Sequence, residues 1–162
     1  MLYREKIKDK LISYYDIDEN VKYGSYDFDF VAKYNQRNAK YVLSKRYEYY
    51  AFTNNNYILY KKLDTKITKD TLDEIKSFLS DSCKKIIKYN DEHMSSNLTI
   101  ILETEIPRDR DLIKKVLNFK FYKSFVFGLK GWVNAGLVLI DPDKQEGLTN
   151  KSHKKELKKF II

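Results

Sequence analysis

Residues 69–102, KDTLDEIKSFLSDSCKKIIKYNDEHMSSNLTIIL, decide the fold. The first part, 69–90, predicts an amphipathic helix, because its apolar residues recur every three or four positions. Acidic residues lie near the start of this segment and lysines near its end, which suits the helix dipole. Residues 98–102 are almost continuously apolar, as is typical of a central strand covered on both faces. We therefore expect a helix followed by a buried strand.

The chain before this stretch predicts one helix and three strands. Residues 2–15 have apolar side chains at helical spacing, and the acidic run 16–20 is expected to lead out of that helix. Between residues 23 and 63 strand-forming residues alternate with polar ones, which predicts an antiparallel meander. We expect its two turns at 33–38 and 53–56, because these segments are polar and asparagine tolerates turn conformations.

The chain after this stretch predicts a further helix and two strands. Pro107 suits the first turn of a helix, where its missing N–H costs nothing. Residues 121–129 and 132–140 predict two strands joined around Lys130 and Gly131, and the segment 98–129 predicts a right-handed strand–helix–strand crossover.

The predicted order of elements is α-βββ-α-β-α-ββ. It indicates a single α+β domain over residues 1–162, a mixed α/β arrangement in which helices pack on one mixed sheet. We expect residues 141–162 to form a basic tail that is less ordered than the rest and ends in a short helix.

Composition excludes several classes of site. One cysteine, Cys83, allows no intramolecular disulfide and no Cys-rich zinc or iron–sulfur site. Neither a Walker A motif, a dinucleotide-binding glycine motif nor a nucleophile elbow occurs, so we expect no cofactor and no catalysis of those kinds. The chain has no apolar run long enough for a transmembrane helix, and its N-terminus does not have the apolar stretch of a signal peptide. We expect a cytoplasmic protein without a membrane partner.

The order of elements over residues 2–140 resembles the core of the restriction-endonuclease-like, or PD-(D/E)xK, superfamily. That resemblance implies a mixed sheet flanked by helices. The family's catalytic motif is absent, because Tyr47-Glu48-Tyr49-Tyr50 has tyrosine in place of the required lysine and 57–62 contains no acid. The segment 125–133, FVFGLKGWV, together with His93-Met94, also resembles an uncharacterised family of small bacterial proteins. This second resemblance implies a bacterial, cytoplasmic protein and no particular activity.

The net charge of +8 is distributed unevenly. Lysine far outnumbers arginine, so an A/T-rich genome could account for much of the excess, but base composition would spread the lysines evenly. Residues 31–62 instead carry seven basic residues against one acid and are rich in tyrosine. Cations attract phosphate, and aromatic rings stack on bases. The candidate nucleic-acid-binding residues are Lys33, Arg37, Lys40, Lys45, Arg46, Lys61, Lys62, Tyr47 and Tyr49.

Four acidic residues form a second candidate site. Glu103 and Glu105 follow the predicted buried strand, and Asp109 and Asp111 are close behind them in the chain. Ligands of open α/β sheets bind at strand ends, and carboxylates suit Mg²⁺ or Mn²⁺. The alternative is that these acids simply begin a helix and complement its dipole.

Three functions remain open from the sequence. The first is a non-catalytic binding or assembly module that forms a homodimer through tyrosine-rich sheet surface. The second is a nucleic-acid-binding protein that uses the basic, tyrosine-rich sheet face. The third is a metal-dependent nuclease whose site has migrated to the four carboxylates.

Overall fold

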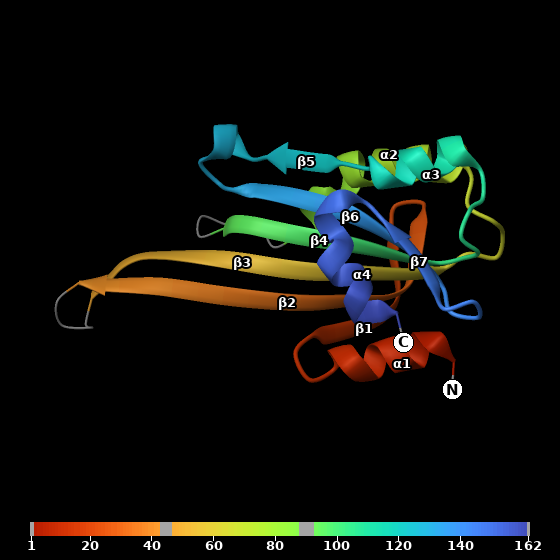
Figure 1. Ribbon diagram of the computed structural model, residues 1–162. Coiled ribbons are helices and arrows are strands. Elements are labelled where there is room, and N and C mark those ends of the chain that lie inside the picture. Colours follow the sequence, from red (N-terminus) through yellow and green to blue (C-terminus); the bar gives the residue numbers. More distant parts are fainter. Residues whose placement is uncertain (1, 43–46, 88–92, 162) are drawn as a thin grey trace.

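The structure is a computed structural model that describes residues 2–42, 47–87 and 93–161, with the backbone alone described for 36–42 and 47–53. One sheet forms its centre, with helices on both faces (Figure 1). The strands are β1 (Asp16–Tyr23), β2 (Tyr26–Val42), β3 (Tyr47–Lys62), β4 (His93–Glu103), β5 (Phe121–Ser124), β6 (Trp132–Asp141) and β7 (Glu146–Thr149). The helices are α1 (Tyr3–Leu11), α2 (Lys69–Ile86), α3 (Arg110–Leu117) and α4 (Lys154–Phe160), with 3-10 turns η1 (Val126–Gly128) and η2 (Lys151–His153).

The sheet is mixed, as the sequence predicts. Its strand order is β1-β2-β3-β4-β6-β5, and β7 pairs with β6 beyond the end of β5. The first three strands form an antiparallel meander, whereas β3, β4 and β6 run parallel to one another. This arrangement confirms the α+β class with helices packed on one mixed sheet. It also brings the C-terminal ends of β3, β4 and β6 to the same edge.

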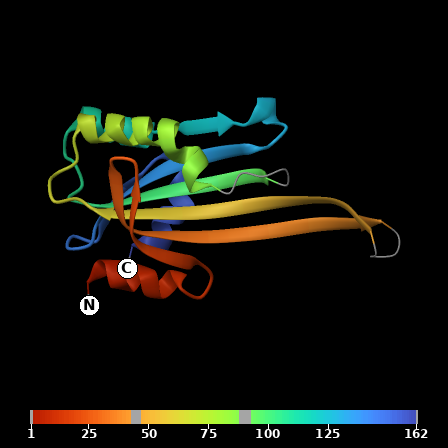
Figure 2. The same cartoon turned by 180° about the vertical axis from the view of Figure 1, so that it is seen from behind.

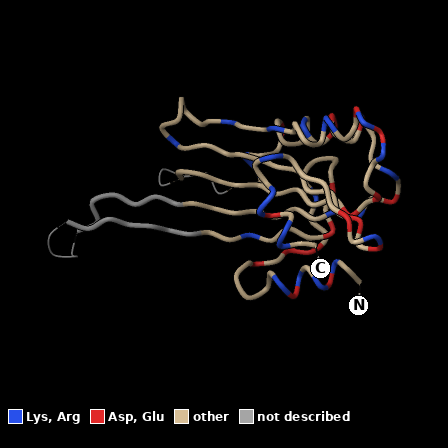
Figure 3. Tube along the Cα trace, in the orientation of Figure 1, with Lys and Arg blue, Asp and Glu red and all other residues tan. Residues whose placement is uncertain are grey.

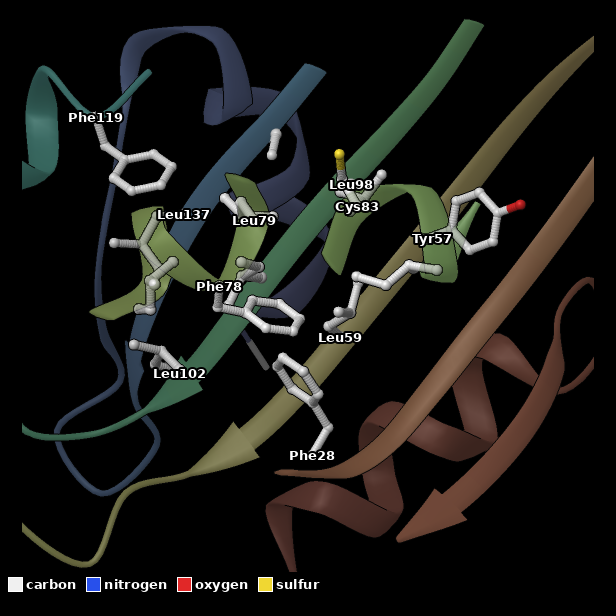
Figure 4. Close-up of a cluster of buried hydrophobic side chains, with 14 of the residues drawn as sticks. Phe28, Tyr57, Leu59, Phe78, Leu79, Cys83, Leu98, Leu102, Phe119 and Leu137 are labelled. Atoms are coloured by element: carbon white, nitrogen blue, oxygen red, sulfur yellow. The ribbon is translucent and has the colours of Figure 1, made fainter. Parts of the chain in front are cut away.

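Helices α2 and α3 cover one face of the sheet. Thr68 and Thr71 form a reciprocal capping box that satisfies two backbone N–H groups at the start of α2. The apolar stripe of α2 then packs on the strands, and Phe78 lies against Phe28 with ring centroids 5.3 Å apart. Figure 4 shows the side chains of this cluster converging between α2 and the strands. Burying a side chain of this size stabilises the fold by about 1.5–3 kcal/mol.

Helices α1 and α4 cover part of the opposite face. Ile7, Leu11 and Phe160 pack there on a second apolar cluster that includes Phe30 and Tyr60. The β1–β2 hairpin bends away from this layer, so that its tip reaches the other face of the sheet beside α2 (Figure 2). Each face thus has its own apolar core. None of the helices in the described ranges is long and apolar enough to cross a lipid bilayer.

Several sequence-based boundaries are wrong. The expected turns at 33–38 and 53–56 lie inside continuous strands, because β2 and β3 pair through both segments and their backbone groups bond across the ladder. The acidic run 16–20 is part of β1, which pairs with β2, and does not merely lead out of α1. The strand expected at 121–129 stops at Ser124, because Val126 and Phe127 adopt positive φ angles that no strand accommodates.

One strand was not predicted: residues 146–149 form β7, which pairs with β6. The short helix expected at the end of the chain is present as α4, residues 154–160, and it packs on the second core. The segment 141–162, expected as a less ordered tail, therefore contributes to the sheet and to that core. The strand that pairs with β4 after the α3 crossover is β6, because β5 forms on the far side of β6.

Candidate functional site

In the described part of the chain, no helix covers one half of one sheet face. α4 crosses the front of the sheet in Figure 1, and the part to its left is uncovered. β4 and β6 carry no Lys, Arg, Asp or Glu before their last residue, and among the residues coloured in Figure 3 the acidic ones lie at the other end of the molecule. We call this surface the open face; its described residues are Tyr34, Asn54, Asn56, Ser95, Asn97, Tyr122, Trp132 and Asn134.

Three asparagines form a ladder across the open face. Asn56 of β3 lies opposite Asn97 of β4, which lies opposite Asn134 of β6. The Asn97 amide donates to the Asn56 side-chain oxygen at 3.5 Å. The register continues outward to Tyr34 on one side and to Tyr122 on the other. Because an amide both donates and accepts, this row offers alternating hydrogen-bonding groups between two aromatic rings.

A second polar row lies beside the ladder. Ser95 is in register with Asn54 and with Trp132, and its hydroxyl donates to the Asn54 side-chain oxygen at 2.6 Å. The Trp132 side chain is 39% exposed and Tyr122 is 58% exposed. Aromatic rings with one apolar surface in water are suited to stacking on a planar ligand.

The three asparagines line one side of a polar cleft of about 250 Å³, and residues of η2 and α4 line the other side. Ser152, His153 and Glu156 line the side of the cleft that faces the asparagines. Asn150 donates from its amide to the Ser152 hydroxyl at 2.7 Å, and Ser152 lies 2.9 Å from His153 Nδ1. The Ser152 hydroxyl therefore links the Asn150 amide to the His153 ring, since a hydroxyl can both donate and accept.

Burial holds this histidine neutral. It lowers the pKa of His153, whereas the Glu156 carboxylate and a hydrogen bond with the Leu98 backbone act in the opposite direction. The His153 side chain is therefore a fixed wall of the cleft at neutral pH rather than a cation.

The β2–β3 hairpin projects beyond the rest of the sheet. β3 pairs with β4 only from Thr53 onward, so its earlier residues pair with β2 alone and form a two-stranded arm (Figure 1). Of the candidate nucleic-acid-binding residues, Arg37, Lys40, Tyr47 and Tyr49 lie on this arm by their backbone positions. Their side chains, and Lys45 and Arg46 entirely, lie outside the described residues.

The other three candidate lysines are ion-paired. Lys33 lies 2.7 Å from Asp18, and Lys61 lies 2.8 Å from Asp27. Lys62 lies 2.8 Å from Glu103 at the opposite end of the molecule from the arm. The structure thus does not gather these three lysines with the arm into one unpaired basic surface.

Lys62 instead lies in one cleft with two of the predicted metal ligands, Glu103 and Glu105. The C-terminal ends of β3, β4 and β6 form a cleft of about 350 Å³, lined by Lys62, Glu103, Glu105 and Lys144 among others. The buried Tyr60 hydroxyl donates to Glu103. Hydrogen bonds from Lys66 and Lys144 lower the pKa of Glu105 to about 2. Both carboxylates are therefore ion-paired with the protein's own lysines, and Glu103 also accepts a hydrogen bond from a tyrosine.

The predicted metal site does not form. Asp109 caps α3 by accepting from the Leu112 N–H at 2.8 Å, and Asp111 lies exposed in the first turn of that helix. In the stretches that the structure describes, no three His, Cys, Asp or Glu side chains are grouped so that they could hold a metal ion. Asp109 and Asp111 instead lie at the start of α3, as the alternative interpretation of these acids predicts.

Comparison with known proteins identifies a family. All of residues 1–162 match the family model of a domain of unknown function, DUF8052. The chain belongs to this family. No curated protein and no solved structure matches it, and the resemblance to the PD-(D/E)xK superfamily is not shown by any comparison.

The asparagines of the open face in this DUF8052 chain are not predicted from the sequence. Asn56 was assigned to a turn, and Asn97 and Asn134 drew no attention because single asparagines in strands carry no local signal. One signal was available: 53–56 and 95–97 are polar, yet they lead directly into apolar strands. Polar residues of that kind inside a sheet indicate a face that no helix covers.

Proposed function

We propose that the DUF8052 chain is a non-catalytic binding module that holds single-stranded nucleic acid on its open face. The observation that carries this proposal is the ladder Asn56–Asn97–Asn134, in register between Tyr34 and Tyr122 on an uncovered sheet face.

The chemistry of the open face fits unpaired bases. Amides donate to and accept from base edges, as Asn and Gln do with adenine. Unpaired bases also stack on aromatic side chains of a sheet face, which is a common mode of single-strand recognition. A duplex hides its base faces, so stacking of this kind favours a single strand.

The charge of the arm supports the same partner. The open face carries little charge and would not attract phosphate by itself, whereas the sequence of the arm contains Arg37, Lys40, Lys45 and Arg46 against the single acid Glu48. A nucleic-acid strand that follows the ladder reaches β2 at Tyr34, and β2 continues from there into the arm, where cations suit a phosphate backbone.

Fluorescence anisotropy with a labelled oligonucleotide of about 12 nucleotides tests the proposal. We expect binding that weakens steeply with salt. Tyr122→Ala should weaken it roughly tenfold, since one stacked base contributes about 1–3 kcal/mol. The matched control is Tyr14→Ala, which removes a ring next to α1 that is 75% exposed.

A charge-reversal pair tests the arm separately. Arg37→Glu with Lys40→Glu should weaken binding and make its salt dependence shallower by about 0.7 per lost phosphate contact. Lys114→Glu with Lys115→Glu makes the same charge change on α3, over the other sheet face, and should have little effect. The absence of binding at low salt would refute the proposal, as would equal losses from the two charge reversals.

A further inference from the structure

The connection between β5 and β6 exposes three apolar side chains. Phe127 is 103% exposed, Leu129 is 83% exposed and Val126 is 50% exposed. We call residues 125–131 the apolar loop. A cluster of large apolar side chains that points into water marks a place where another molecule binds.

The apolar loop has a defined conformation. The buried Phe125 donates its N–H to the Gly131 carbonyl at 2.9 Å, and its own carbonyl accepts from the N–H groups of Gly128 and Lys130. His93 Nδ1 lies 2.7 Å from the Lys130 carbonyl, to which it donates. The side chains at the tip are therefore presented on a fixed backbone.

The backbone of the loop is strained at its tip. Val126 and Phe127 have φ angles of 48° and 53°, in the left-handed region that bulky residues rarely adopt. Gly131 has a positive φ as well, and a β-carbon there would lie 2.1 Å from the Met94 carbonyl oxygen. Strain concentrates at functional positions, and here it holds the Phe127 ring outward.

The same chain carries a cleft that suits such a side chain. Between the tip of the β1–β2 hairpin and α2 lies a cleft of about 560 Å³, with Tyr23, Tyr26 and Phe78 among its lining residues. The rings of Tyr26 and Phe78 are stacked with centroids 5.0 Å apart, which gives the cleft an aromatic floor. Edge-to-face and offset contacts with these rings favour a further phenyl ring. We call this the aromatic cleft.

Charge is complementary between the two features. Glu74 and Asp81 line the aromatic cleft, together with Lys85. The chain from residue 112 to 140, which includes the apolar loop, contains lysines and no acid. The loop lies beyond the end of β5, whereas the cleft lies beside α2 at the hairpin tip (Figures 1 and 2). Phe127, which is fully exposed, therefore lies outside the aromatic cleft of its own copy.

We propose that the apolar loop of one copy seats Phe127 in the aromatic cleft of a second copy. The contact joins two different surfaces, so a reciprocal exchange closes a dimer and a one-way contact extends a chain of copies. This self-association uses neither the open face nor the arm, and it is independent of nucleic acid.

Sedimentation velocity of the full chain, without nucleic acid and at concentrations up to about 1 mM, tests the contact. Wild type should sediment increasingly faster than a monomer as its concentration rises. Phe127→Ser should raise the dissociation constant roughly ten- to a hundredfold, because it removes the buried ring. Ile12→Ser is the matched control, since it removes an exposed apolar side chain at the end of α1.

A mixing experiment identifies the two surfaces. Ser77→Trp fills the aromatic cleft from an exposed position on α2 and should weaken self-association at least as much as Phe127→Ser. A mixture of these two variants should form a one-to-one pair, because one retains the cleft and the other retains the loop. The proposal is overturned if wild type stays monomeric, if Phe127→Ser associates like wild type, or if the mixture stays monomeric. A monomeric wild type that floats with anionic lipid vesicles through Phe127 would identify a lipid surface as the partner instead.

Discussion

The imidazole ring of His153 occupies the space in front of Gly136, where a β-carbon would lie 2.0 Å from Nδ1. Glycine in a central strand weakens it, and here its presence is explained by the close approach of a side chain from η2. The absence of a side chain at Gly136 lets His153, which lines the polar cleft, pack directly on the middle of β6.

Gly136→Ala should therefore destabilise the protein by about 1–3 kcal/mol, since the added methyl group must displace the ring. Urea denaturation followed by circular dichroism measures the loss. In Gly136→Ala with His153→Ala the methyl group no longer meets the ring, so the double variant should lose less stability than the sum of the single variants. Additive losses would show that the two residues do not collide.

Stability should fall as the pH drops below 6.5, the ordinary pKa of histidine. Because burial lowers the folded-state pKa of His153, the unfolded chain binds this proton more readily. The contribution to stability is complete above pH 6.5 and is lost as the pH falls toward the lower folded-state value. Urea midpoints at a series of pH values measure the slope. His153→Gln should flatten it in this range, and an unchanged slope would assign the dependence to other groups.

Tyr60→Phe should destabilise the fold by about 1–3 kcal/mol. The variant keeps the ring stacked on Phe30, with centroids 4.8 Å apart in wild type, but leaves the buried Glu103 carboxylate without its hydroxyl donor. Lys62 alone then neutralises Glu103. Urea denaturation compares this variant with Tyr14→Phe, an exposed tyrosine whose hydroxyl should contribute little. Equal stabilities of the two variants would contradict a role for the Tyr60 hydroxyl.

The Glu105 carboxyl should remain ionised at about pH 3, where an ordinary glutamate is mostly protonated. Ion pairs with Lys66 and Lys144 at 2.8 and 3.1 Å lower its pKa to about 2. The contribution of these pairs is present above pH 4.5 and is lost as the pH falls through 2. Carboxyl chemical shifts measured by NMR give the titration. Lys66→Ala with Lys144→Ala should return the pKa toward 4.5, and an unshifted titration in this double variant would argue against the pairing.

The sequence predicts the elements whose signals are local. α2 is found because its apolar stripe and its charges at both ends all lie within one segment. The turns predicted within the meander are wrong because the contacts that decide these segments are not local. Residues 33–38 are polar enough for a turn, but cross-strand pairing with 52–57 keeps them in β2.

The open face depends on contacts between distant segments. Asn56, Asn97 and Asn134 become neighbours only because β3, β4 and β6 pair in parallel, in one register. A shift of one residue would turn each asparagine to the opposite face, and no local pattern fixes that register. The aromatic cleft likewise forms only because the hairpin tip bends onto α2. The spacing of Tyr23 and Tyr26 in the sequence does not predict that bend.

The second apolar core has a consequence for the order in which the chain can fold during synthesis. Tyr3 on α1 donates its hydroxyl to the Phe160 carbonyl, 157 residues later, and both helices share the cluster around Phe30 and Tyr60. α1 leaves the ribosome first among these elements, but its partner leaves last. The apolar side of α1 can therefore pack on β2 and β3 early, but the part of the cluster that Phe160 covers stays open until nearly all of this sequence has been made.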